Sequence, residues 1–172
     1  MTRIIMAVGV LFALTVNSAD AQSREGFWIG FGLGGGSYTE DGLSGREAGG
    51  VGYLKLGTTL SERFLLGVES NAWVKEVSGV DLTATNFSAV AYFYPSATGG
   101  FFLKLGLGVA SAELAVGGVS ISESAAGGVF GIGYDRRIGD NWSITPFLNS
   151  NVGQFDSGNT SVVELGVGVT WH

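Results

Sequence analysis

Apolar side chains recur at every second position in long stretches of this 172-residue chain. The runs FFLKLGLGVA at 101–110 and VELGVGVTW at 163–171 show the pattern clearly. Side chains of a β-strand point alternately to its two faces, so this period predicts strands with one apolar face. The other clear segments are 27–34, 53–60, 64–75 and 142–153. Each has about the length of a tilted strand that crosses a bilayer.

Two further segments, 86–94 and 129–135, are predicted strands because they are rich in β-branched and aromatic residues. This makes eight strands. The facing of these two is less clear than that of the other six. We expect the following side chains to point outward with the apolar faces: Ala89, Ala91, Phe93, Phe130, Ile132 and Tyr134.

The face opposite the apolar one carries mainly glycine and small polar residues. Glycine makes up 30 of the 172 residues, and charged residues only 14%. A solvent-exposed face normally carries many more Lys and Glu side chains, whereas an eight-stranded barrel has a narrow interior. We therefore predict an all-β protein, an eight-stranded antiparallel up-and-down transmembrane β-barrel with its apolar face toward lipid. The period also leaves open a soluble barrel of the lipocalin type.

The first residues have the features of a secretory signal peptide. Arg3 gives a basic start, residues 4–16 are uncharged and mostly apolar, and Ala19-Asp20-Ala21 provides the small residues of a cleavage site. The apolar run is too short for a membrane helix, which needs about 20 residues. We expect residues 1–21 to be removed before Gln22 and residues 22–172 to form the barrel domain. The chain has no cysteine, so no disulfide stabilises it.

The predicted connections alternate between two lengths. Residues 61–63, 95–100 and 137–141 are short turns, whereas 40–47, 76–82, 113–126 and 154–159 are, on average, longer loops. Short periplasmic turns and longer outer loops are typical of outer-membrane barrels. Aromatic side chains near the short turns are expected to form a girdle at the membrane–water interface. Its main members are Phe27, Trp28, Phe64, Phe101, Trp142 and Trp171.

The terminal run indicates that the last strand is needed, because a barrel in lipid must pair its last strand with its first. Glu164, Gly166, Val169 and Trp171 resemble the C-terminal assembly signal of outer-membrane barrels. The whole mature chain resembles small eight-stranded outer-membrane barrels of the OmpA/OmpX type. This resemblance implies integral insertion in a bacterial outer membrane, contact with its lipids, and recognition by the barrel-assembly machinery during biogenesis. It does not by itself imply an activity.

Four charged residues occupy inward positions: Lys55, Glu69, Lys104 and Glu164. If the turn at 61–63 is tight, Lys55 and Glu69 lie opposite each other, because antiparallel partners there have residue numbers that add up to 124. Unpaired buried charges are costly, so we expect an inward Lys55–Glu69 pair, with Lys104 and Glu164 near enough to extend it. We favour a structural network; the alternative is a narrow path for protons or ions.

The sequence offers little for catalysis. The single histidine, His172, is the last residue, so we expect no catalytic triad, no metal or thiol site and no cofactor. The predicted outer loops are acidic, which favours solubility or, alternatively, contact with a surface ligand or divalent cations. We predict a non-enzymatic, monomeric barrel with a structural or surface-interaction role and no nucleic-acid partner. The alternatives are a narrow porin-like channel and, less favoured, a soluble periplasmic lipocalin-like binding protein.

Overall fold

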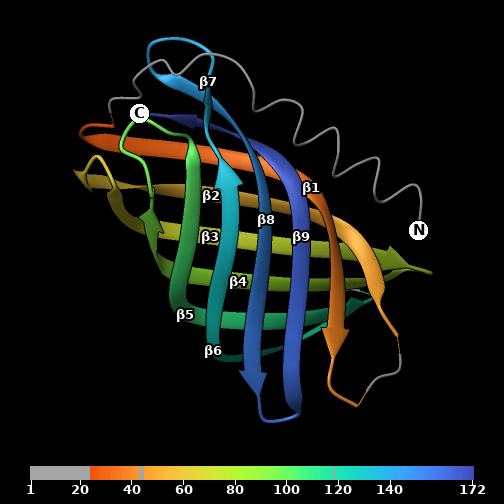
Figure 1. Cartoon of the computed structure of the whole chain (residues 1–172). Helices are drawn as coiled ribbons and strands as arrows, with labels where there is room; N and C mark the ends of the chain where they lie inside the picture. The colour runs from red at the N-terminus through yellow and green to blue at the C-terminus, as the bar shows by residue number, and fades with distance from the viewer. Residues whose placement is uncertain (1–23, 43–44, 118) are drawn as a thin grey trace.

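The computed structural model describes residues 24–42, 45–117 and 119–172, which form one closed antiparallel barrel (Figure 1). The expected signal peptide and its cleavage site before Gln22 lie outside these residues. The strands are β1 (Phe27–Glu40), β2 (Glu47–Ser61), β3 (Phe64–Val77), β4 (Val80–Phe93), β5 (Phe101–Val116), β6 (Val119–Tyr134), β7 (Arg136–Arg137), β8 (Trp142–Phe155) and β9 (Gly158–Trp171). Among the described residues there is no helix with the length and hydrophobicity to span a bilayer.

The predicted eight-stranded barrel is confirmed, with one short extra strand. The sheet order is β6-β5-β4-β3-β2-β1-β9-β8-β7, and pairing of β6 with β8 closes the ring. The first and last long strands pair as expected, with Ile29 opposite Trp171. The two residues of β7 continue β6 after a break at Asp135, whose backbone N–H donates to the carbonyl of Gly100.

The outward and inward faces follow the predicted alternation. In β4, Ser88, Val90 and Tyr92 are buried, so Ala89, Ala91 and Phe93 point outward. In β6, Phe130 is 55% exposed and Val129 only 2% exposed. The expected facing of both uncertain segments is therefore correct. An apolar outer band and a closed ladder are the two properties that a strand barrel needs in lipid.

Aromatic side chains fill the half of the barrel near the short turns. Trp28 packs there with Leu65, Val90, Tyr92, Tyr94, Phe102 and Val129. Gly57 and Gly67 are directly paired, and a Cβ atom at either would lie within 2.7 Å of the Trp28 ring. Trp28 is 1% exposed, so its expected place among the interfacial aromatics is wrong. Its parity points it inward, and the two glycines provide the space for its ring.

The strands extend farther at the opposite end than predicted. The expected outer loops at 76–82 and 113–126 are wrong, because most of these residues are in strands. β3 and β4 are joined by Ser78 and Gly79, both with positive φ, as in the type I′ turns that favour tight hairpins. β5 and β6 remain paired up to Val116 and Val119.

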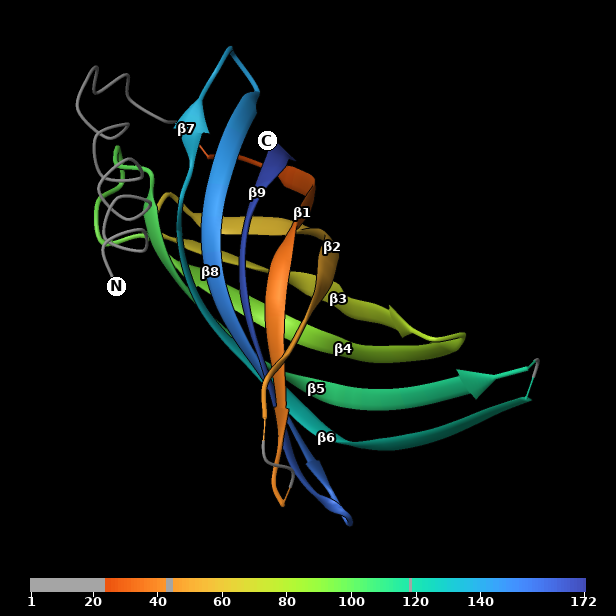
Figure 2. The ribbon, with the colours of Figure 1, turned by 90° about the vertical axis from the view of Figure 1, so that its right-hand side faces the viewer.

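Pairing between β6 and β8 stops much earlier, at Ala126 and Gln154. The outer halves of β3–β6 therefore leave the ring as a separate curved sheet, which Figure 2 shows diverging from the β8–β9 and β1–β2 hairpins. We call residues 75–85, 111–117 and 119–125 the outer flap.

Candidate functional site

A buried ion pair lies in the middle of the barrel. Glu69 of β3 pairs with Lys104 of β5, and both side chains are almost fully buried. The same carboxylate accepts hydrogen bonds from the Tyr92 hydroxyl at 2.5 Å and from the Asn71 amide at 2.8 Å. Donors from three strands thus converge on one carboxylate, which satisfies a charge that would otherwise be costly to bury.

Lys55 has a different environment from the one predicted. It lies directly opposite Glu69 in the β2–β3 register and points inward. The expected Lys55–Glu69 ion pair is nevertheless wrong, because Glu69 pairs with Lys104. The Lys55 ammonium lies 5.0 Å from the Tyr92 ring centroid and within 6 Å of Trp28, Tyr53 and Phe102. The register sets which Cα atoms are neighbours, but it does not set which side chains meet. The lumen is so narrow that a long side chain such as Lys104 reaches across it to Glu69.

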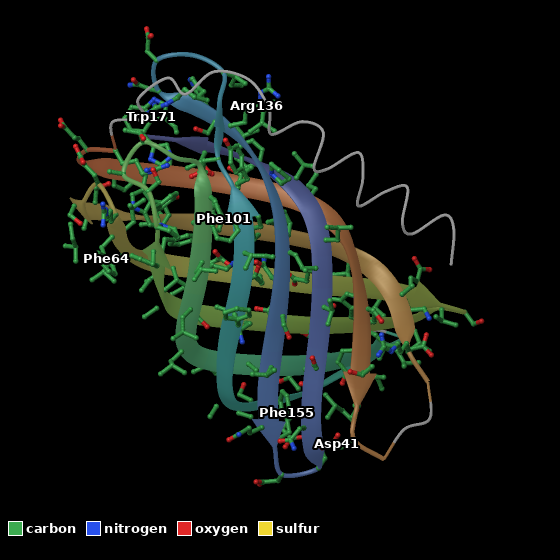
Figure 3. The ribbon with its side chains drawn as sticks, in the orientation of Figure 1. Asp41, Phe64, Phe101, Arg136, Phe155 and Trp171 are labelled. Atoms are coloured by element: carbon green, nitrogen blue, oxygen red, sulfur yellow. The ribbon has the colours of Figure 1, made fainter. Side chains whose placement is uncertain are left out.

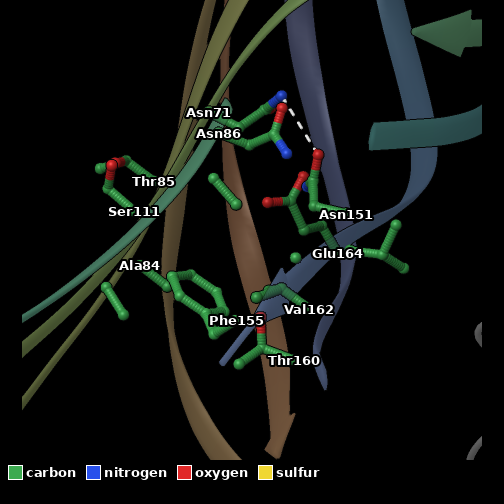
Figure 4. A pocket seen from close by; sticks show the side chains of 14 residues that line it. Asn71, Ala84, Thr85, Asn86, Ser111, Asn151, Phe155, Thr160, Val162 and Glu164 are labelled. Carbon is green, nitrogen blue, oxygen red and sulfur yellow. Dashed lines mark hydrogen bonds between the residues drawn. The ribbon is translucent and has the colours of Figure 1, made fainter. Parts of the chain in front are cut away.

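Glu164 of β9 borders a small cavity in the outer half of the barrel (Figure 4). It accepts a hydrogen bond from the Asn149 amide at 3.2 Å rather than pairing with Lys104. The cavity volume is about 20 Å³, and Asn71 and Asn151 approach within 3.5 Å beside it. A volume of about 10–15 Å³ accommodates one water, so this cavity has room for a water molecule but not for a larger solute.

A polar cluster that sequence reasoning missed closes the short-turn end. The Arg24 guanidinium lies 3.6 Å from the Tyr94 ring centroid and donates to the carbonyls of Glu62, Ala97 and Gly99. The Tyr94 hydroxyl and the Thr145 hydroxyl each donate to the carboxylate of Asp135 at 2.6 Å. Burial raises the pKa of Tyr94, so its hydroxyl stays protonated and remains a donor. The alternation of apolar residues along β6 stops at Asp135. This interruption is the sequence signal that could have identified Asp135 as a member of a buried polar cluster.

His172 belongs to the same cluster. Its Nε2 atom lies 3.8 Å from Asp135 Oδ2, and its side chain is buried. Burial lowers the pKa of His172 to about 4, against the attraction of Asp135. His172 Nδ1 has no hydrogen-bond partner within the described part of the chain.

The remaining aromatic residues of the predicted girdle are on the outer surface. Phe27, Phe64, Phe101 and Trp142 are about half exposed, and Trp171 lies opposite Trp142 in the register. Figure 3 shows Phe64, Phe101 and Trp171 at the end opposite Asp41 and Phe155. Glu164 and Gly166 also lie on β9, and Val169 faces outward opposite Phe31. Their roles at the interface and in assembly stay predictions.

The polarity of the two faces reverses where the outer flap begins. On the outward face of β5, apolar residues give way to Ser111 and Glu113 after Val109, and Ser111 bonds Ser124 of β6 at 2.7 Å. The opposite face of the flap, which continues the barrel lumen, becomes apolar. Its apolar side chains lie in paired rows and are Val77, Val80, Leu82, Ala84, Ala112, Leu114, Val116, Val119 and Ile121. Lys75 and Glu123 lie on the same face, opposite Leu82 and Ala112.

The apolar rows of the flap continue from the interior of the barrel. Leu82 and Ala84 pack against a buried group of Val51, Trp73 and Val162 at the barrel mouth. Farther out the cover is lost, and Ile121 is 72% exposed. The sequence signal for this surface is present at 110–116, where alternation persists with the opposite phase of polarity and runs into the loop expected at 113–126.

The charges of the flap are mostly negative. Glu76, Asp81, Glu113 and Glu123 are exposed, whereas Lys75 forms an ion pair with Glu47 of β2. Within the described ranges, no three acidic or histidine side chains are placed to hold a metal ion. The outer end therefore offers a largely apolar sheet face that carries Glu123, with Glu76, Asp81 and Glu113 on the reverse face.

Comparison with known proteins places this geometry among outer-membrane barrels. The family model described as "Outer membrane protein beta-barrel domain" matches residues 6–172. Neisserial surface protein A superposes with a TM-score of 0.72 at 15% identity, covering 87% of this chain and 99% of that one. Ail, the attachment invasion locus protein of Yersinia pestis, gives 0.54 at 19% identity, covering 87% and 100%. The N-terminal barrel of Pseudomonas aeruginosa OprF gives 0.52 at 14%, covering 87% and 100%. No curated protein matches the chain.

Proposed function

Because the chain belongs to the outer membrane protein beta-barrel domain family and is integral to a bacterial outer membrane, we propose that it is a non-enzymatic, monomeric barrel whose outer flap makes contacts at the cell surface. The observation that supports this is the reversal of polarity at the flap. Beyond Leu82 and Ala84, which pack at the barrel mouth, this apolar sheet face is exposed, and an exposed apolar patch is typical of an interaction surface. The buried network at Glu69 and Lys104 then has a structural role.

The proposal includes the route to the membrane. Residues 1–21 direct export, and the β9 pattern that ends at Trp171 is read by the barrel-assembly machinery. Outer-membrane lipids contact the apolar band of outward side chains. These steps are inferred from the sequence pattern and from the family.

The charge of the flap suggests what kind of partner it contacts. Ail of Yersinia pestis has been solved in complex with the heparin analogue sucrose octasulfate. The flap of this chain carries exposed carboxylates at Glu76, Asp81, Glu113 and Glu123, which disfavour a polyanion of that kind. We therefore propose a basic partner.

A trimmed barrel tests the proposal. Ser111 and Ser124 are directly paired, so residues 112–123 can be replaced by an Asn-Gly turn without changing the register. The trimmed and full barrels are placed in phosphatidylcholine vesicles, and vesicle binding to a polylysine-coated sensor is measured. We expect binding to fall at least 10-fold, with unchanged mobility of the unheated barrel on gels.

A second variant tests the carboxylates of the flap separately from its apolar surface. Glu113→Gln with Glu123→Gln removes the two carboxylates but retains the apolar rows. Sucrose octasulfate on the same vesicles serves as the opposite-charge probe and should not bind. Equal binding by full and trimmed barrels would show that the flap is not the contact surface.

A further inference from the structure

We propose that the side-chain oxygens of Glu164, Asn71 and Asn151 bind one Na⁺ ion inside the barrel. From the sequence we expected no metal site, because the chain has no cysteine and its single histidine is the last residue. Oxygen ligands from β3, β8 and β9 come together only in the closed barrel. The inference does not depend on the proposed surface contacts. Three observations support it: the cavity, an amide oxygen without a donor, and a carboxylate without a cation.

The three side chains border the cavity of about 20 Å³ in the outer half of the barrel. Figure 4 shows them grouped, with Phe155 and Val162 at a distance from them. Further residues that line the cavity are Ala84, Ala110, Ala112 and Thr160. Ala112 and Thr160 are partly exposed, and the cavity reaches Gly153 near the end of the β6–β8 pairing. A small ion can therefore reach Glu164 from the outer end.

Hydrogen bonds orient the two amides. Asn71 Nδ2 donates to Glu69 at 2.8 Å and approaches Asn151 Oδ1 at 3.5 Å. Asn71 Oδ1 accepts no hydrogen bond from any described residue, although Asn71 is only 2% exposed. A buried acceptor left in this way is costly, and a water or a cation has to satisfy it. Asn151 Nδ2 also lacks a partner in the described part of the chain, so water is the rival occupant.

Charge favours a cation over water. The described hydrogen-bond donor to Glu164 is the neutral amide of Asn149, and Lys104 is already paired with Glu69. The charged groups that act on the Glu164 carboxylate are Lys104, which attracts it, and Glu69, which repels it. Two buried carboxylates thus share one ammonium group. A monovalent cation at Glu164 compensates the remaining negative charge, whereas a water molecule does not.

The ligands and the space select a small monovalent ion. Carboxylate and amide oxygens are hard ligands, which suit alkali and alkaline-earth cations. Ca²⁺ takes about 6–8 oxygen ligands, and Mg²⁺ usually keeps several of its waters. One carboxylate, two amide oxygens and a cavity of about 20 Å³ provide for neither ion. The same space accommodates a dehydrated Na⁺ ion, which is similar in size to a water molecule.

The ion does not pass beyond this site. Asn71 contacts Glu69, which pairs with Lys104 and accepts a hydrogen bond from Tyr92. Tyr92 in turn packs against Trp28 in the aromatic layer. A positive ammonium group and a packed layer therefore lie behind the ligands. Na⁺ binds from outside without conduction, and it connects β3, β8 and β9 close to the point where the ring opens.

The test uses the full mature barrel in lipid nanodiscs, with NMR of its side-chain amides. NaCl is raised while choline chloride is lowered, so that ionic strength stays constant; choline is too large for the cavity. We expect the amide signals of Asn71 and Asn151 to shift and to saturate with Na⁺. Because an ion that binds only the folded chain stabilises it, NaCl should also raise the urea midpoint relative to choline chloride.

Three variants make the test specific. Glu164→Gln keeps the shape of the side chain but removes its charge, so half-saturation should require at least 10-fold more Na⁺. Asn151→Leu removes an oxygen ligand and should have the same effect. Glu62→Gln, an exposed position at the short-turn end, is the matched control and should leave half-saturation unchanged. The mobility of unheated protein on gels shows that each variant is folded.

Four results would overturn the inference, and none of them bears on the surface contacts. Equal shifts in choline chloride alone would mean a general effect of salt. Saturation that Glu164→Gln does not change would place the ion elsewhere. Displacement of Na⁺ by CaCl₂ at one-tenth of its concentration would identify a site for divalent ions. Amide signals that ignore Na⁺ but show contact with a bound water would identify water as the occupant.

Discussion

The carboxylate of Glu69 illustrates how single residues hold the barrel interior together. It accepts bonds from Tyr92 and Asn71 and pairs with Lys104, so its burial is compensated by groups from three other positions. Lys55, by contrast, lies among aromatic rings. Two lysines with the same inward parity thus have different partners, and their mutations should have different consequences.

We predict strong coupling between Lys104 and Glu69. Lys104→Met leaves a buried carboxylate without its cation and should cost about 3–5 kcal/mol, whereas Lys104→Met with Glu69→Gln should cost less than the sum of the single changes. Urea unfolding in detergent measures these free energies. Lys55→Met combined with Glu69→Gln is the matched control and should show the weaker coupling. Stronger coupling through Lys55 would contradict the observed pairing.

The environment of His172 predicts a dependence of stability on pH. The charged groups around its imidazole are Asp135, Lys55, Arg137 and Arg24, and burial holds its pKa at about 4 instead of 6.5. Below pH 6.5 the unfolded chain binds a proton that the folded chain does not, so stability falls as pH falls from 6.5 toward 4. The unfolding free energy should be about 2 kcal/mol lower at pH 5 than at pH 7 from this group. His172→Gln should remove that part of the slope, and an unchanged slope would refute the assignment.

At the scale of single elements, β9 combines barrel closure with the proposed assembly signal. It pairs with β1 on one side and β8 on the other. Its outward residues are ordinary lipid-facing positions, so a charge there has two effects, one on insertion and one on recognition.

The pair Trp142 and Trp171 separates these effects, because the two residues lie opposite each other and both face outward. A charge at either costs a similar amount in lipid, but only Trp171 belongs to the terminal pattern. We expect Trp171→Asp to lower outer-membrane levels of the barrel much more than Trp142→Asp, with export of both unaffected. Fractionation and unheated gels provide the measurement. Equal losses of outer-membrane barrel in the two variants would mean that the charge acts only through its cost in lipid and not through the assembly signal.

β5 crosses from the lipid band into the outer flap, which gives a second matched pair. Leu105 is 63% exposed on the lipid side, and Leu114 is 42% exposed on the lumen side of the flap. Arg on the lipid face near the midplane costs about 2–4 kcal/mol, whereas Leu114→Arg replaces a side chain that meets solvent. Leu105→Arg should therefore lower the unfolding free energy in lipid vesicles by that amount and Leu114→Arg by much less. The reverse order would place the membrane boundary elsewhere.

For the whole molecule, the packing of the interior is the property that a test of ion conduction examines. The aromatic layer around Trp28, the Glu69–Lys104 pair and the cluster of Arg24, Tyr94 and Asp135 fill the lumen. A cavity of about 20 Å³ beside Glu164 and one of about 10 Å³ beside Glu69 and Lys104 do not accommodate a hydrated ion.

We accordingly expect no steady conductance when the barrel is inserted in planar bilayers at 100 mV, under conditions in which a larger porin conducts. Reproducible current steps that change with Glu164→Gln would instead support the ion path considered from the sequence. Current that is insensitive to Glu164→Gln but sensitive to Trp28→Ala would place the path through the aromatic layer.

Much of the fold could be predicted from period alone. Alternation at 101–110 and 163–171 sets the strands, their two faces and the need for closure, because side-chain parity in a strand is a local property. Parity also placed Lys55, Glu69, Lys104 and Glu164 inward, and the arithmetic of one tight turn placed Lys55 opposite Glu69. The expected interfacial position of Trp28 rests on its aromatic character, whereas its place in the alternation of β1 points it inward.

The tertiary structure alone decided which inward groups meet. Glu69 pairs with Lys104, which is 35 residues away and on a strand that is not its neighbour, because side chains cross the narrow lumen. Asp135 and His172 meet for the same reason, and no local pattern encodes such distances. The flap is intermediate: its reversed alternation is present in the sequence at 110–125, but its free edge depends on where β8 ends relative to β6. Register between strands that are distant in sequence is a property of the closed ring, so only the assembled barrel shows which edge remains unpaired.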